Sequence, residues 1–268
     1  MLVISAPGFP SVMMMGPAGK VLASGPESVT GNPAAIVSGF TASGGRWNLR
    51  TTGISVAGAF SANSKMNFSG GITYLGRTGI IRRDETGTVT GQYSFGAGTA
   101  LVGMSYSLAP WLSGGVSAGL SWENIAEQGG TGFTCSAGIK ADFPEGMKAG
   151  IVLSGIGQAP SWNGTRKGMP TEISAGVSYA LGSMLTSFAG GRLGFSASDA
   201  LGGGLEVNCC DMTVSGGYRY VPGEDEISGF FAGFQYSYTS GGIYRIEAAV
   251  SQRRELEWPV FAGISISL

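Results

Sequence analysis

Residues that commonly perform catalysis are scarce in this sequence, and histidine is absent. Without histidine a Ser-His-Asp site cannot form, and the commonest general base and metal ligand is missing as well. The glycine runs at 44–45 and 202–204 lack the lysine and the strand–loop–helix context of a phosphate loop. We therefore expect no enzyme, no cofactor and no metal site, and we expect these glycines to serve curvature and close packing.

The 3 cysteines are too few for a disulfide framework. Cys135 falls on an apolar strand face, where a small buried or lipid-facing thiol is expected. Cys209 and Cys210 are adjacent in a predicted turn, so they either remain thiols or form a vicinal disulfide.

Charged residues on the predicted inward faces of strands are the most informative polar groups. Both signs are present in equal number, which predicts little ion selectivity. The groups are Glu123, Lys140, Asp142, Lys148, Glu172, Arg192, Glu206, Arg219, Arg245 and Glu247. Inside a barrel such groups must pair or stay hydrated, so they either tie the wall to a plug or line a polar conduit.

Two predicted loops carry most of the remaining chemistry. The loop 77–96 contains Arg82 and Arg83, and the loop 156–169 contains Trp162 and Arg166. They are the longest loops predicted at the end of the barrel opposite the short turns, and are therefore the best places for a partner or ligand. A solvated loop without a specific role is the alternative.

The elements that position these groups are predicted by strict alternation. From Leu112 to Trp122 every second residue is apolar or glycine, and the residues between are Ser113, Gly115, Ser117, Gly119 and Ser121. Period two indicates a β-strand. The small hydroxylated face is typical of a crowded wet interior, with the apolar face turned toward lipid.

The same design repeats about 14 times between residues 40 and 268. Each candidate strand is long enough to cross a bilayer at a tilt, which takes about 9–11 residues. Short turns such as 63–64, 144–145 and 209–210 alternate with longer links, as in barrels with short periplasmic turns. We predict an all-β, closed antiparallel transmembrane barrel in the bacterial outer membrane, with both termini periplasmic.

Composition agrees with one such domain. Charged residues make up 12% of the chain, glycine accounts for 48 of 268 residues, and nothing resembles a linker. The net charge of -1 gives no basic footprint for nucleic acid. We expect a single domain over 1–268 whose first 39 residues form a plug and whose residues 40–268 form the barrel.

The N-terminal segment lacks alternation and contains prolines typical of turns, with room for a short helix after Pro33. Residues 1–12 match an export signal poorly, because they have no basic start and are broken by Pro7, Gly8 and Pro10. Either the signal was removed before the numbered chain begins or the true start lies upstream.

Residues 14–18 and 31–35, which contain Asn32, Pro33 and Ala34, resemble the N-terminal signature of the PorV/PorQ family of outer-membrane barrels. Further similarity lies at 103–108, 112–116, 203–207 and 215–219. The resemblance implies a 14-stranded barrel, akin to the FadL transporters, in which Asn32, Pro33 and Ala34 belong to a structural plug.

Function follows from that resemblance only in outline. The family implies a non-enzymatic component of type IX secretion, or a surface anchor for secreted protein partners. The alternative is a FadL-like passive channel for hydrophobic small molecules. A soluble or extracellular β-structure is a third hypothesis. Membrane lipid is a partner in the first two.

Overall fold

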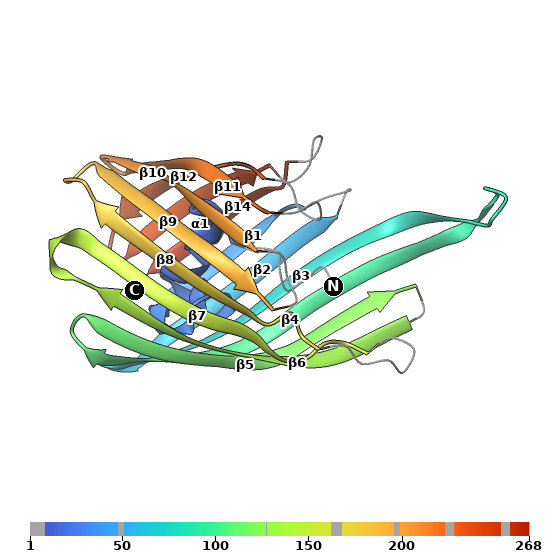
Figure 1. Cartoon of the computed structure of the whole chain (residues 1–268), viewed down its shortest axis with the longest axis horizontal. Helices are drawn as coiled ribbons and strands as arrows, with labels where there is room; N and C mark the ends of the chain where they lie inside the picture. Colours follow the sequence, from blue (N-terminus) through green and yellow to red (C-terminus); the bar gives the residue numbers. More distant parts are fainter. Residues whose placement is uncertain are drawn as a thin grey trace.

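The computed structural model describes residues 9–47, 51–126, 128–161, 168–195, 199–222, 228–252 and 258–267. Their strands form one closed antiparallel barrel of 14 strands, as predicted (Figure 1). The strands are β1 (Gly39–Arg46), β2 (Thr52–Asn63), β3 (Met66–Arg83), β4 (Val89–Ala109), β5 (Leu112–Ile125), β6 (Gln128–Asp142), β7 (Met147–Gln158), β8 (Glu172–Ala180), β9 (Leu185–Gly194), β10 (Ala200–Cys209), β11 (Met212–Tyr220), β12 (Gly229–Thr239), β13 (Ile243–Ser251) and β14 (Val260–Ser267).

Each strand pairs with its neighbours in the sequence, and the barrel closes where β1 pairs with β14. That seam runs from Gly39 opposite Ser267 to Arg46 opposite Val260. Closure leaves the wall itself without a free sheet edge. Within the part of the chain that the structure describes, no helix has the length and apolar character needed to cross a membrane.

The barrel has its apolar side outward. On β5, Leu120 is 62% exposed whereas Ser121 is 2% exposed, so the alternation predicted for this strand is confirmed. The strand β9 resolves an ambiguous pattern in the same way, because Phe188 is buried and Leu193 is exposed. An exterior of exposed Ile, Leu, Val and Phe suits lipid and not water.

The described part of the predicted plug consists of short helical turns. These are α1 (Pro10–Met13), η1 (Gly16–Ala18), α2 (Gly19–Leu22), η2 (Pro26–Thr30) and η3 (Pro33–Ala35); a further turn, η4 (Pro144–Gly146), joins β6 to β7. The five N-terminal turns lie inside the strands (Figure 1) and contact wall strands on several sides. Phe9, Val21 and Val29 are each 1% exposed or less, so the core of the molecule lies between plug and wall.

One predicted loop is wrong. Residues 77–96 are mostly strand, because β3 continues to Arg83 and β4 begins at Val89. Arg82 and Arg83 therefore lie at the end of β3, not in a loop. Beyond the pair Arg77–Phe95 these strands pair only with each other, apart from one hydrogen bond in which the backbone nitrogen of Ala126 donates to Ser94. Figure 1 shows this hairpin, residues 78–94, projecting from the barrel, and we call it the upper hairpin. The mixed charges and glycines of this stretch concealed the strands.

Candidate functional site

A row of glycines brings the wall into direct contact with the plug. Gly150, Gly176, Gly190 and Gly202 are paired in sequence across β7, β8, β9 and β10. A Cβ atom at Gly190 would lie 2.7 Å from Ala18 Cα, and one at Gly150 would lie 2.8 Å from Val21 Cγ1. Both distances are too short for a side chain, so glycine is required for this close approach. Of the glycines in the runs named above, Gly202 belongs to this row, and a Cβ atom there would lie 2.9 Å from Pro17 Cδ, so this glycine serves close packing.

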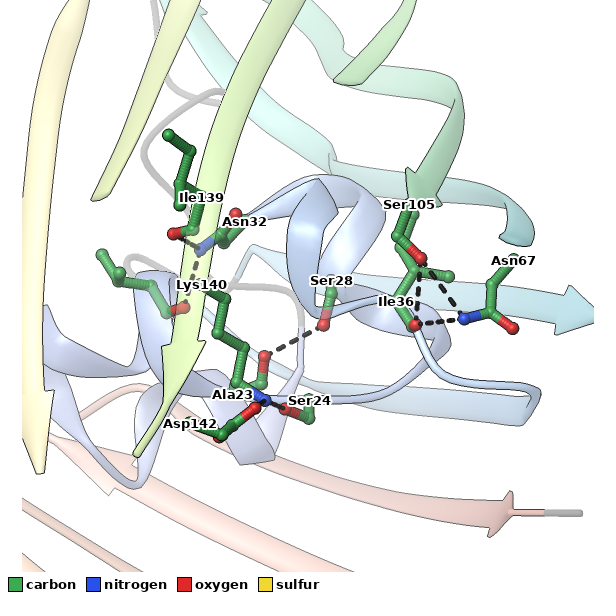
Figure 2. A network of polar contacts seen from close by, with 11 residues as sticks. Ala23, Ser24, Ser28, Asn32, Ile36, Asn67, Ser105, Ile139, Lys140 and Asp142 are labelled. Carbon is green, nitrogen blue, oxygen red and sulfur yellow. Dashed lines mark hydrogen bonds and ion pairs between the residues drawn. The ribbon is translucent and has the colours of Figure 1, made fainter. Parts of the chain in front are cut away.

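The predicted plug motif contributes a fully hydrogen-bonded amide. Asn32 is 0% exposed, and its Nδ2 donates to the backbone oxygens of Val21 and Ile139, each at 3.1 Å (Figure 2). Its Oδ1 accepts from the backbone nitrogen of Ala34 at 3.1 Å, which caps η3. One side chain therefore joins α2, η3 and the wall strand β6.

Pro33 and Ala34 of the plug lie against the neighbouring wall strand, β5. Both are buried, and any side chain at Gly115 of β5 would overlap their backbone. Pro33 begins the turn η3, where its fixed φ and missing N–H are favourable. The Asn-Pro-Ala motif is thus wedged against β5 and β6.

Two further polar contacts join the plug to the wall near this motif (Figure 2). Lys140 donates to the hydroxyl of Ser24 at 2.9 Å and pairs with Asp142 at 3.2 Å. On the other side, Asn67 and Ser105 donate to the backbone oxygen of Ile36 at 3.1 and 3.3 Å. The plug is therefore fixed by hydrogen bonds from several strands.

A second charged group lies at the start of β8. Glu172 forms ion pairs with Lys20 of α2 and, at 3.5 Å, with Arg192 of β9. Lys20 also donates to Ser154 of β7 at 2.8 Å. The predicted charges Glu172 and Arg192 are thus brought together, and the plug supplies a second cation.

A third charged group joins α1 and η2 to β13. Glu27 and Glu247 are each 4% exposed. Ser11 donates to Glu27 at 2.9 Å and Ser265 donates to Glu247 at 3.5 Å. Burial raises the pKa of Glu27 above its usual value, while Arg245 acts in the opposite direction. Glu27 Oε2 has no hydrogen-bond partner among the described residues.

The other predicted charges lie elsewhere on the wall. Glu123 is buried on β5, and Glu206 of β10 accepts from Asn208 at 3.4 Å. Arg219 is half-buried on the inward face of β11, and Arg245 donates to Ser267 at 3.4 Å. Trp162 and Arg166 lie outside the described residues.

The sequence interpretation missed Lys20 and Glu27, which carry the plug's side of two charged groups. They are the only charged residues before Arg46, and that isolation within an uncharged segment was the available signal. Their partners lie on strands far along the chain; Lys20 and Glu172 are separated by 152 positions in the sequence. Sequence proximity could not identify those partners.

The outer surface over the glycine row is hollowed into an apolar groove of about 1150 Å³, which we call the outer groove. It crosses β6 to β10, and every lining residue is Gly, Ala, Val, Leu or Ile. Small residues such as Ala175, Ala189 and Gly203 line it together with Ile139 and Ile151. The plug packs against the opposite side of these strands, so only the sheet separates the groove from the plug.

Three solved structures that align with nearly the whole chain are described as toluene transporters or as a monoaromatic hydrocarbon channel. The toluene transporter TodX of Pseudomonas putida aligns with TM-score 0.70 and 12% identity over 99% of this chain and 98% of its own. The toluene transporter TbuX of Ralstonia pickettii aligns with TM-score 0.67 and 14% identity over 98% of each chain. The monoaromatic hydrocarbon channel CymD aligns with TM-score 0.65 and 12% identity over 96% of this chain and 97% of its own.

At these identities the likeness establishes the fold alone, a closed antiparallel barrel with a short helical N-terminal segment. No protein-family model matches the chain. No curated protein matches it either.

Proposed function

We propose that the chain is a non-enzymatic passive channel for hydrophobic small molecules in the bacterial outer membrane. The observation that carries the proposal is the outer groove, an apolar hollow beside the plug and large enough for a small ligand. A groove without a polar side chain offers water no partner, so it favours hydrocarbon.

The fold supports the same substrate class. TodX and TbuX are described as toluene transporters, and each covers nearly the whole of this chain. These structures are described as transporters or channels for hydrocarbons and not as parts of a secretion system. They therefore give no support to the hypothesis of a secretion component of the PorV/PorQ type. The channel hypothesis is therefore the better supported of the two.

The plug controls the route in this proposal. It is held by hydrogen bonds and ion pairs and not by apolar contacts alone, so it has a defined position that excludes free passage of polar solutes. A hydrophobic molecule would pass along surfaces like the outer groove, where glycines bring the wall closest to the plug.

Uptake of radiolabelled toluene by intact cells tests the proposal. Cells that lack their own hydrocarbon channels are compared with and without this chain, and a hydrophilic sugar is the control solute. We expect faster entry of toluene and unchanged entry of sugar. Equal toluene entry in both strains, with the barrel shown to be folded by heat-modifiability, would reject the channel function.

A matched pair of variants localises the effect. Ala189→Trp fills the outer groove, whereas Ala232→Trp adds the same bulk to an exposed position of β12 outside it. We expect the first to slow toluene entry several-fold and the second to leave it unchanged. Equal effects would mean that the groove has no part in transport.

A further inference from the structure

The turn between β10 and β11 presents two adjacent thiols that the transport proposal does not use. Cys209 pairs with Met212 across this hairpin, so Cys210 and Asp211 form its tip. Both cysteines are exposed and unoxidised, and their sulfur atoms lie 3.9 Å apart. Cys135 lies far from them on β6 and is half-buried.

The backbone holds the second thiol in an unusual position. Cys210 has φ +56°, one of three non-glycine residues with positive φ among those described. This left-handed conformation costs a residue with a Cβ roughly 1–2 kcal/mol, and glycine would avoid that cost. A cysteine here keeps a sulfur beside Cys209 at the expense of local stability.

The contact with Cys209 raises the pKa of Cys210. The thiolate is the reactive form of cysteine, and whichever sulfur reacts first has the other only 3.9 Å away. The pair is therefore placed to complete an exchange within one turn.

We propose that Cys209 and Cys210 form a redox-active vicinal dithiol that closes to a disulfide by exchange with an oxidant of the disulfide class. One of the two cysteines attacks a sulfur of the oxidant RSSR as its thiolate, forming a mixed disulfide and releasing one RS⁻. The other cysteine then loses its proton and attacks the protein sulfur of that mixed disulfide, which forms the vicinal bond and releases the second RS⁻. The sum is one dithiol plus RSSR giving one protein disulfide plus two RSH.

The bond would be easily reversed. Adjacent Cα atoms are about 3.8 Å apart, whereas disulfide-linked Cα atoms are usually about 4.4–6.8 Å apart. The resulting strain makes the bond more reducible than a structural disulfide. The turn lies at the end of the barrel that carries the short turns, which we predict to face the periplasm, an oxidising compartment.

Purified protein in detergent tests the chemistry without reference to transport or to location. It is treated with oxidised glutathione, alkylated with a maleimide and measured by intact mass spectrometry. We expect a species lighter by two hydrogen atoms in which two of the 3 cysteines no longer take maleimide. Brief treatment with a mild thiol should restore both labels. Two glutathione adducts, an intermolecular dimer or unchanged labelling would each overturn the proposal.

Three variants assign the atoms. Cys135→Ser should behave like the unmodified chain apart from one label fewer. Cys210→Ser should stop at the mixed disulfide, with one glutathione retained on Cys209. Cys209→Ser should likewise stop at the mixed disulfide, with one glutathione retained on Cys210. Loss of the light species in Cys135→Ser would place the bond elsewhere and reject the vicinal pair.

Discussion

The wall strands β6 to β10 and the upper hairpin of β3 and β4 are built from the same unit, two antiparallel strands joined by a turn. In the wall, each strand contacts a neighbour on both edges and the plug on one face, and glycine is required where the plug backbone approaches. Beyond Phe95 the upper hairpin has no third strand, and nearly all its side chains are exposed. Long-range packing thus determines the first region, and local turn chemistry determines the second.

The turn of the upper hairpin illustrates the local case. Asp84 Oδ1 accepts hydrogen bonds from the backbone nitrogens of Thr86 and Thr88, each at 2.9 Å, and from the Thr86 hydroxyl at 2.6 Å. All three partners lie within four residues of Asp84. In the wall, by contrast, Asn32 reaches Ile139 across 107 residues. Substitutions in the two regions should therefore differ in how far their effects extend.

The largest effect is expected for Asn32→Ala. It removes three buried hydrogen bonds and leaves the carbonyls of Val21 and Ile139 without their donor. Each unsatisfied buried group costs about 1–3 kcal/mol, so we expect a loss of roughly 3–5 kcal/mol in denaturant unfolding of the detergent-solubilised barrel. Asn63→Ala is the control, because Asn63 bonds only its own exposed turn. Similar losses in both variants would contradict a special role for the plug contact.

Gly190→Ala should have the next largest effect. The added methyl would meet the Ala18 backbone, which cannot move without shifting the plug. Overpacking of this kind costs about 1–3 kcal/mol. Gly70→Ala is the same substitution at an exposed strand position, where the added methyl would make only an ordinary contact, with Leu101 O at 3.8 Å. Unfolding midpoints that fall equally in the two variants would show that glycine serves the strand and not the plug.

Glu27→Gln should stabilise the plug at neutral pH. We call the plug docked when it is packed inside the barrel, as in this structure, and undocked when it is not. The pKa of Glu27 is raised in the docked plug, so the docked state binds the proton of this carboxyl group more tightly than the undocked state. Docking is therefore strongest below the undocked pKa of about 4.3 and weakens as pH rises toward the docked value. A neutral amide removes this loss, because it carries no charge to be desolvated at any pH in this range. Unfolding measured from pH 4 to 8 should have a smaller pH slope in the variant; an unchanged slope would exclude Glu27 as its source.

The features that could be predicted from the sequence are those that repeat along the chain and depend on neighbouring residues. Alternation of Leu120 and Ser121 identifies a strand and its lipid face, because period two is a property of neighbouring residues. Pairings such as Lys20 with Glu172 could not be predicted, because many acidic residues lie on inward faces and only the barrel's closure selects one. The length of β3 and β4 was missed for the opposite reason. Residues 77–96 contain charges and glycines typical of turns, and strands that pair outside the wall need not alternate.

The smallest effect on the barrel is expected for Asp84→Asn. Hydrogen bonding, chiefly from Thr86, lowers the pKa of Asp84, so the turn is most stable above the ordinary carboxyl pKa and loses that stability as pH falls through the lowered value. The amide keeps an acceptor but loses the charge that strengthens it. We expect faster hydrogen exchange at Thr86 and Thr88 at neutral pH, with the unfolding midpoint of the barrel unchanged. A drop in that midpoint would mean that the upper hairpin stabilises the wall, and the division into a long-range and a local region would then fail.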